Sequence, residues 1–383
     1  MTHAAVEKPM NMPHSPLLTV DRGTCYVLFA YNVGRSLDLD AAERRVTAIK
    51  ERSRIKHNRR APSYFDFSPA PLRMTQEIEP LTIGGYRTSS GVDLLLYDFG
   101  AVSVTYSLPI EGAFAHLLSL SLDLYENALL LADSRRQVDE LIRALEDAVE
   151  RPYIDDAVED FAIFHIEAST PADWRERLTM DHAQAIAQML RSEAQVLAEE
   201  EVRDAVAQQI CFGTDDVTVI DWNAALVVGR EMDDVRAVLE FANVELLEMR
   251  LLDKQLDQSL DQAYDALSKR QWNRMRLPGT FHTDVRSIAR LQVDSAILFE
   301  RVTNTLKLLG DQYLARVHRL VSQRFHLESW DASISRKLQT LESIYGKMTD
   351  NAATKRAEVL EWIIIVLIAV SIAVSFLPGS PGH

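Results

Sequence analysis

The sequence predicts an α+β protein: a mixed α/β amino-terminal head, then a long helical hairpin or coiled-coil stalk, and one C-terminal transmembrane helix. Three features predict this class. Short β-branched and aromatic runs separated by glycine lie in the first 170 residues. Leucines spaced by threes and fours dominate the second half. An uncharged apolar run follows Glu361.

The composition is that of a folded protein, with 47% hydrophobic and 25% charged residues in a chain of 383. Cys25 and Cys211 lie far apart in the sequence and belong to no CxxC motif, so neither a disulfide framework nor a zinc site is predicted. The formal net charge of −15 argues against nucleic-acid or anionic-lipid binding over the whole surface. A local basic patch is compatible with this charge.

The first part of the chain is predicted to form the head. Residues 1–20 fit neither a secretory signal nor a transit peptide, and we expect a flexible N-terminus there. The head itself is predicted over residues 21–170, with residues 61–90 as a long connection rich in proline and glycine. Alternation and spacing predict strands at 25–31, 92–99, 101–108 and 161–166, a turn at Gly100, and helices after Asp38 or Asp40, across 111–130 and across 134–150.

A helical domain is predicted over residues 171–357, interrupted by a β insertion near residues 209–229. Two of its long helices, joined by a short turn, are expected to pack antiparallel as a hairpin stalk. Leucine-rich seams at 235–267 and 334–348 predict a homo-oligomer if the hairpin leaves one seam uncovered. The spacing places long helices at about 172–209, 233–267 and 284–325, and from Ser329 onward.

The apolar run near the C-terminus predicts a membrane anchor over residues 358–377, followed by a short tail at 378–383. Glu361 would reach the headgroups, and Trp362 would lie in the interfacial belt. Lys355 and Arg356 precede the run, and no Lys or Arg follows it. This bias predicts a tail-anchored, single-pass membrane protein with a cytoplasmic N-terminus, in a bacterium at the inner membrane. The alternative is a buried core helix.

A basic patch lies between residues 44 and 60, where Glu51 is the one acidic residue. It is either a solvated helix face that pairs with acidic groups, or a contact surface for RNA phosphates or anionic lipid headgroups. No aromatic residues are interleaved as in base-stacking proteins, which argues against sequence-specific readout. The candidate polyanion-binding residues are Arg44, Arg45, Lys50, Arg52, Arg54, Lys56, Arg59 and Arg60.

The sequence predicts no catalytic residues, metal site or cofactor. Asp98-Phe99-Gly100 matches the kinase metal-binding triplet, but no H-R-D loop or V-A-I-K strand accompanies it, so a β-turn is favoured. Residues 82–91 are rich in glycine and hydroxyl groups but lack the G-K-[ST] of a phosphate loop, so a plain turn is expected there too. The acidic groups at 155–160 and 199–201 could hold a divalent cation only if the fold converges them.

Two segments resemble the "required for meiotic nuclear division" family, also called YagE-like. The run Leu360-Glu361-Trp362 and the apolar residues after it are similar to the family's C-terminal anchor, and Tyr97–Val104 is similar to its strand pair. Ser371 stands where the family usually carries an acidic residue. The resemblance implies tail-anchored architecture more firmly than it implies an activity. Eukaryotic members support organelle translation, so it also implies an association with ribosomes.

These features together predict a non-enzymatic, tail-anchored membrane scaffold or tether that exposes a cytosolic head on a helical stalk. Its expected partners are the lipid bilayer, further copies of the chain and another protein, with no small-molecule substrate. One alternative is an RNA- or ribosome-associated membrane tether that acts through the 44–60 patch. The other is an enzyme with an unrecognised site in the head.

Overall fold

The computed structural model describes residues 18–50, 69–170, 182–230, 232–272 and 312–376, together with a few helical positions between 293 and 300. Contacts divide the chain into two compact units. The first, which we call the head, takes in Met1–Glu248 and Arg301–Glu328. The second takes in Met249–Glu300 and Ser329–His383. The structure confirms the predicted α+β class, with a large sheet and helices.

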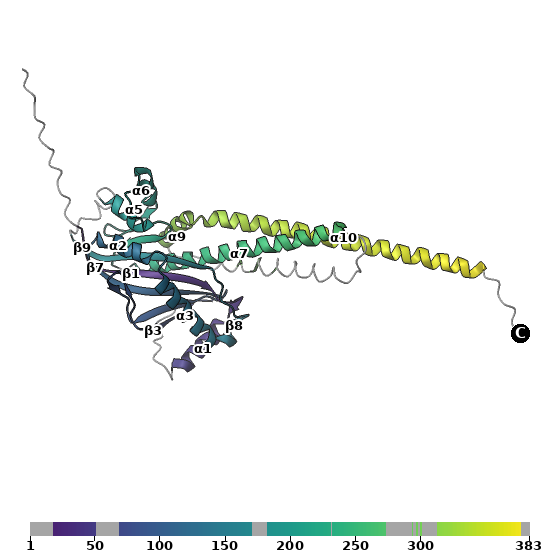
Figure 1. The fold of residues 1–383 in the computed structure, drawn as a ribbon, viewed down its shortest axis with the longest axis horizontal. Helices are drawn as coiled ribbons and strands as arrows, with labels where there is room; N and C mark the ends of the chain where they lie inside the picture. Colours follow the sequence, from purple (N-terminus) through teal and green to yellow (C-terminus); the bar gives the residue numbers. More distant parts are fainter. Residues whose placement is uncertain are drawn as a thin grey trace, which may run out of the picture. The chain divides into compact units, whose positions relative to one another are not determined.

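An eight-stranded sheet forms the centre of the head (Figure 1). Its order is β10-β11-β12-β9-β1-β7-β6-β3, and all neighbours are antiparallel except β12 and β9, which are parallel. The strands are β1 (Thr19–Asn32), β3 (Leu72–Glu77), β6 (Gly91–Leu96), β7 (Ala101–Ala113), β9 (Val158–Thr170), β10 (Gln209–Ile210), β11 (Val217–Ile220) and β12 (Ala224–Val228). Two small sheets pair β2 (Ser36–Leu37) with β8 (Val149–Glu150), and β4 (Thr82–Ile83) with β5 (Tyr86–Arg87).

Several predicted strands are present, and some extend further than expected. β6 and β7 form the expected hairpin, with a turn in which Gly100 has a φ of +90° and its amide donates to Tyr97 O. β1 and β9 each run several residues beyond the predicted 25–31 and 161–166. β3 lies within the stretch expected to be a connection, so proline and glycine on either side concealed a strand.

Helices cover both faces of the sheet. One face packs against α2 (His116–Leu124), α3 (Ala128–Ala144) and α5 (Ala183–Arg191). On the other face, Phe241 of α7 (Asp233–Trp272) lies 6.0 Å from the ring of Tyr97. Phe325, just after α9 (Gln312–Arg324), lies 5.4 Å from Phe161 of β9. The sheet is therefore buried between two helical layers, which accounts for its apolar side chains on both sides.

Local sequence signals explain where several helices begin and end. The Asp38 carboxylate accepts from the Ala41 amide at 2.9 Å, so Asp38 rather than Asp40 caps α1 (Leu39–Lys50). Asn127 caps α3 in the same way through the Leu130 amide. α2 and α3 replace the helices predicted at 111–130 and 134–150, because β7 continues to Ala113 and a short 3₁₀ turn follows α3.

The region predicted as the start of a helical domain belongs largely to the head. In place of one helix over 172–209, the described residues form α5 and the short α6 (Glu199–Ala205). The β segment near 209–229 is present as β10, β11 and β12. These strands extend the head sheet through the parallel pairing of β12 with β9, so they are not an insertion into a helical domain.

The second unit contains the later part of α7 and most of α10 (Leu327–Phe376), and these two helices run parallel. Asp253 accepts from Ser333, and Asp257 pairs with Lys337 at 2.6 Å, so both contacts join residues 80 positions apart. A constant separation of this kind requires parallel helices, because antiparallel helices would pair rising numbers with falling ones. The antiparallel hairpin was predicted for helices joined by a short turn, which involves the helix expected at 284–325; most of that helix lies outside the described residues, so the hairpin stays a prediction.

Most of the described seam residues of these two helices are buried within one chain. Leu252, Leu256 and Ala263 of α7 are buried, as are Ile334 and Leu341 of α10. Lys337 contacts Asp253 at 2.7 Å beside this seam. The described seam residues therefore leave no apolar stripe of the kind that suggested self-association through 235–267 and 334–348.

The structure corrects the predicted membrane anchor. α10 continues as one helix to Phe376, yet within the described residues no helix is both long and apolar enough to span a bilayer. This finding overturns the transmembrane helix predicted at 358–377 and, with it, the predicted single-pass membrane localisation. Of the proposed interfacial residues, Glu361 is exposed, and the side chains of Lys355, Arg356 and Trp362 lie outside the described residues. The tail at 378–383 also lies outside them.

Candidate functional site

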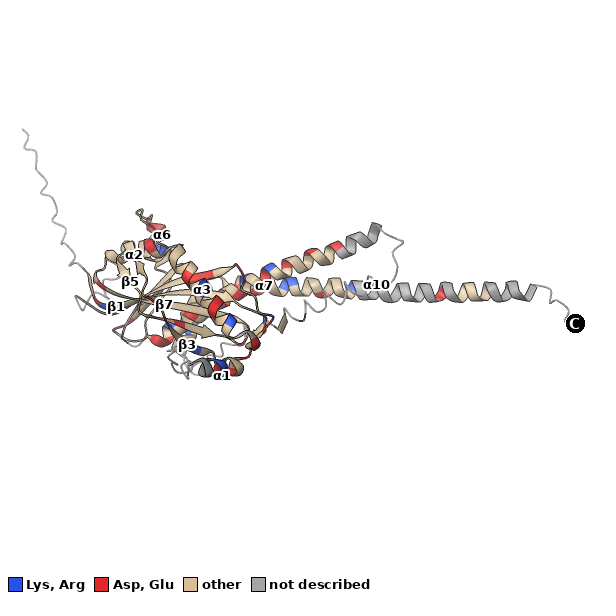
Figure 2. Cartoon of the chain, turned by 60° about the horizontal axis from the view of Figure 1, so that its bottom comes forward, with Lys and Arg blue, Asp and Glu red and all other residues tan. Residues whose placement is uncertain are grey.

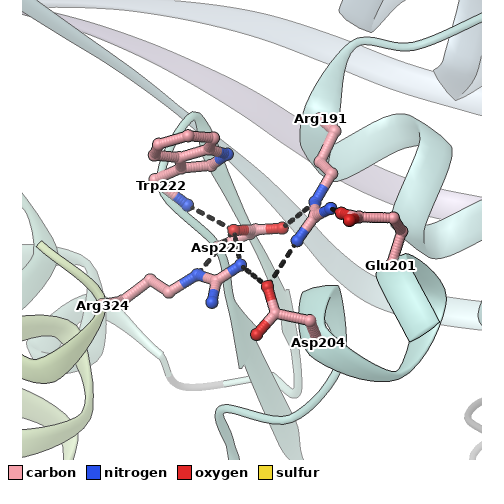
Figure 3. A network of polar contacts seen from close by, with 6 residues as sticks. All are labelled: Arg191, Glu201, Asp204, Asp221, Trp222 and Arg324. Atoms are coloured by element: carbon pink, nitrogen blue, oxygen red, sulfur yellow. Dashed lines mark hydrogen bonds and ion pairs between the residues drawn. The ribbon is translucent and has the colours of Figure 1, made fainter.

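A polar cluster in the head joins four separate elements (Figure 3). Arg191 is the last residue of α5, and Asp204 and Glu201 belong to α6. Asp221 follows β11, where the chain turns towards β12, and Arg324 is the last residue of α9. We call these five residues the arginine cluster. It connects residues that lie more than 100 positions apart in the sequence.

Asp221 lies at the centre of the arginine cluster and is fully buried. Its Oδ2 accepts from Arg191 Nε at 3.0 Å, and its Oδ1 accepts from Arg324 Nε at 2.6 Å and from the Trp222 amide at 2.8 Å. Asp204 Oδ2 accepts from Arg191 at 2.6 Å and from Arg324 at 2.9 Å. Arg191 also pairs with Glu201. Two guanidinium groups thus face three carboxylates, so the cluster carries almost balanced charge.

The charges of the arginine cluster are mutually stabilised. Burial alone would lower the pKa of Arg324, but its contacts with Asp204 and Asp221 raise that pKa above the usual value. The hydrogen bond from Arg324 lowers the pKa of Asp204. Arg324 and Asp204 therefore stay ionised near neutral pH and hold α9 against the sheet edge. The arrangement suits structural attachment better than proton transfer, which needs a pKa near the working pH.

A second set of polar residues lies on α7, which is buried on all sides between Val238 and Met249. Glu240 accepts from Arg73 of β3 at 3.0 Å and from the Thr105 hydroxyl of β7 at 3.2 Å. Asn243 donates to Glu159 O at 3.1 Å. A polar group on each turn of the helix therefore has a partner on a different part of the head, which fixes the helix in one register.

The two later glutamates of this stretch contact a histidine and a side-chain amide instead of an arginine. Glu245 contacts His318 of α9 at 3.0 Å. Glu248 is only 1% exposed and accepts from the Asn32 side-chain amide, at 2.9 Å to Oε1 and 3.1 Å to Oε2. Burial, together with the nearby Asp155 carboxylate, raises the pKa of Glu248 to about 7, although the Asn32 amide opposes this shift. Glu248 therefore changes its charge close to neutral pH.

The structure describes the predicted polyanion-binding patch only in part. Figure 2 shows basic residues on α1. Arg44 and Arg45 of this helix are exposed, and Arg45 pairs with Asp147 at 2.5 Å. Lys50 ends α1, but its side chain lies outside the described residues. The rest of the patch, Arg52, Arg54, Lys56, Arg59 and Arg60, lies wholly outside them. The Arg45 pair fits the interpretation of a solvated face, and polyanion binding stays a prediction.

The two turn motifs have the structural roles that were favoured for them. Asp98-Phe99-Gly100 forms the β6–β7 turn, and residues 82–91 form a small hairpin of β4 and β5. His165 Nε2 is hydrogen-bonded with Gly229 O at 2.8 Å in the core. Among the residues that the structure describes, no three His, Cys, Asp or Glu side chains are grouped as metal ligands, so the acidic groups at 155–160 and 199–201 do not converge.

Neither the arginine cluster nor the buried glutamates were predicted from the sequence. The partners of Asp221 lie 30 and 103 positions away, so no local spacing relates them. The burial of the glutamates on α7, by contrast, could have been predicted from the sequence. Between Val238 and Met249 most residues are apolar on every side of the helix, a pattern typical of a fully buried helix. Glutamates within such a stretch are expected to be buried and paired.

Comparison with known proteins corrects the resemblance suggested by the C-terminal run. The sequence matches the family described as "Uncharacterized protein MJ0711, N-terminal domain" over residues 22–234. It is 21% identical over 191 residues to "Uncharacterized protein MJ0711" from Methanocaldococcus jannaschii, which covers 49% of this chain and 57% of that protein.

These matches do not support a YagE-like or meiosis-related family, so that prediction was wrong. The matched residues run from within β1 into the start of α7, and thus include all eight strands of the large sheet except the first residues of β1. Because the match takes in more than half of the 383 residues, the protein belongs to the MJ0711 N-terminal domain family.

Proposed function

We propose that the protein is a non-enzymatic scaffold whose copies associate through the distal part of α10. The observation that carries this proposal is the exposure of five consecutive apolar residues. Ile364, Ile365, Val366, Leu367 and Ile368 are each between 52% and 63% exposed. A contiguous apolar surface of this kind marks an interaction site in most folded proteins.

The occupant that we propose for this surface is a second copy of the chain. Successive residues of an α-helix are about 100° apart, so five in a row present apolar side chains in every direction. A partner must therefore offer a long apolar surface of its own, and another α10 does so. Between residues 347 and 376, three basic residues (Lys347, Lys355, Arg356) balance three acidic ones (Asp350, Glu358, Glu361). Association there avoids the repulsion expected from a chain of net charge −15.

α7 supports the scaffold interpretation because one uninterrupted helix of 40 residues belongs to both units. Its first part is fixed in the head by Glu240, Asn243 and Glu248. Its later part pairs with α10 through Asp253 and Asp257. A continuous helix joins the head to the helices that would assemble, which a scaffold requires and which an enzyme does not.

The two alternative functions stay predictions. An enzyme would need ionisable groups free to act on a substrate, whereas Glu240, Asp221 and the two arginines of the cluster are occupied by one another or by protein partners. RNA or ribosome binding through residues 44–60 has support only from the exposure of Arg44 and Arg45. Neither alternative has an observation as specific as the exposed segment of α10.

The proposal predicts that the full chain exceeds the monomer mass. Light scattering across a concentration series is expected to show oligomers at tens of micromolar. Replacing Ile364 and Leu367 together with glutamate should yield monomers, because ionised side chains in an apolar interface would lose their hydration. A matched control introduces the same residues at exposed positions of α10, Gln339→Glu and Ser343→Glu, and should leave the oligomer intact. A wild-type chain that is monomeric at every concentration would refute self-association.

A further inference from the structure

We propose that protonation of Glu248 stabilises the last turn of α7 within the head, and that ionisation of Glu248 destabilises this turn. Glu248 is the final head residue of α7, and Met249 begins the second unit. The contact therefore lies where the helix passes from one unit to the other. A change of charge at this position would alter how firmly the head holds the helix that the proposed scaffold uses.

One buried atom beside Glu248, the side-chain oxygen of Asn32, favours the protonated acid. Asn32 Nδ2 donates to the carboxyl group, while Asn32 Oδ1 is buried and has no hydrogen-bond partner among the described residues. A carboxylate has no proton to offer this oxygen. A protonated Glu248 can donate its hydroxyl to Asn32 Oδ1 and still accept from Nδ2, which completes a pair of hydrogen bonds between an acid and an amide. Protonation thus satisfies a buried acceptor that ionisation leaves without a donor.

The other groups that face Glu248 offer no compensating positive charge. In the described part of the chain, no Lys or Arg forms an ion pair with Glu248. The loop after β8 brings Asp155 and Tyr153 towards it, and the charge of Glu248 contributes, after burial, to a Tyr153 pKa of about 12. Arg135 is occupied by the main-chain carbonyls of Ile154 and Asp155.

Main-chain hydrogen bonds connect the segments that carry Asn32, Tyr153 and Asp155. The Asp155 amide donates to Asn32 O at 3.0 Å, and the Tyr153 amide donates to Val33 O at 3.1 Å. One turn earlier on α7, Glu245 contacts His318 of α9. His318 therefore faces Glu245, and no hydrogen bond joins it to Glu248 in the described residues. Asn32 thus joins β1 and the 153–155 loop through its main chain, and α7 through its side chain.

The direction of the pH dependence follows from the raised pKa of Glu248. The folded protein retains this proton up to a pH of about 7, whereas the unfolded chain releases it near the ordinary value of about 4.3. The stability that the proton contributes is fully present below the lower value and is lost as the pH rises towards 7. Each pH unit within this window should change the local opening equilibrium by up to about tenfold.

Native-state hydrogen exchange on the full chain tests this proposal. Exchange is compared between wild type and Glu248→Gln, because glutamine stays neutral and can donate to Asn32 Oδ1 as the acid does. After correction for the intrinsic pH dependence of exchange, we expect the wild-type protection of amides 244–250 to fall at least tenfold from about pH 5 to about pH 7.5. Protection in Glu248→Gln should stay constant.

One further variant separates the proposal from a general effect of pH. Glu342→Gln changes an exposed glutamate on α10 and should follow wild type. Equal pH dependence in wild type and Glu248→Gln would overturn the proposal. That result is independent of the oligomeric mass, so it is distinguishable from failure of the proposed scaffold function.

Discussion

Replacing Asp221 with alanine is expected to lower the free energy of unfolding of the head by about 3 kcal/mol. The substitution removes the one fully buried acceptor of the arginine cluster and leaves Arg191 and Arg324 with the more exposed Asp204 and Glu201. Removing one partner of a buried ion pair typically costs about 3–5 kcal/mol, because the other charge stays desolvated. Because Asp204 and Glu201 still pair with the two arginines, we expect a loss at the lower end of this range.

Chemical denaturation followed by circular dichroism measures this loss. Asp215→Ala is the matched control, because Asp215 is an exposed aspartate in the turn before β11. It should change the free energy of unfolding by less than about 0.5 kcal/mol. If Asp221→Ala were no less stable than Asp215→Ala, the arginine cluster would not hold α9 to the sheet.

Replacing Arg73 with methionine is expected to destabilise the head by about 3–5 kcal/mol, for a related reason. Glu240 is almost fully buried and would keep only the Thr105 hydroxyl as a donor. Because a buried pair is costly to desolvate, replacing both members with apolar residues is often neutral. The double variant Arg73→Met/Glu240→Leu should therefore recover most of the loss and unfold within about 1–2 kcal/mol of wild type.

A double-mutant cycle distinguishes this account from simple loss of packing. It compares wild type, the two single variants and the double variant by their free energies of unfolding. We expect the double variant to be more stable than Arg73→Met alone. If the two single losses merely added, the ion pair between β3 and α7 would carry no coupling, and the buried charge would have another partner.

The sequence predicted correctly those elements of the fold that the spacing of neighbouring residues determines. The β-branched run around Val27 and the glycine at position 100 indicated β1 and the β6–β7 hairpin, because alternation and turn chemistry act over a few residues. β3 was missed because its neighbours are rich in proline and glycine. The strands at 209–228 were expected, but their pairing with β9 depends on a parallel connection that local pattern cannot specify.

The candidate site was less predictable because its partners are distant in the chain. Asn32 and Glu248 are 216 residues apart, and Glu240 meets a strand that precedes it by 167 residues. A glutamate on a predicted amphipathic helix is normally assigned to solvent, and only the apolar residues on every side of this stretch of α7 indicated otherwise. The parallel pairing of α7 with α10 was also not predicted, since these two helices are not consecutive in the sequence.

Cysteine crosslinking along α10 tests the proposed scaffold most directly. Single cysteines are placed at positions 364 to 368 in a Cys211→Ser background, where the remaining Cys25 is buried. We predict that mild oxidation links two full chains at several of these positions, because copies that associate through this segment bring equivalent residues together. Asp215→Cys, on the head, should remain unlinked. If none of the five positions forms dimers above the level of Asp215→Cys, copies of this chain do not meet through α10, and the central claim fails.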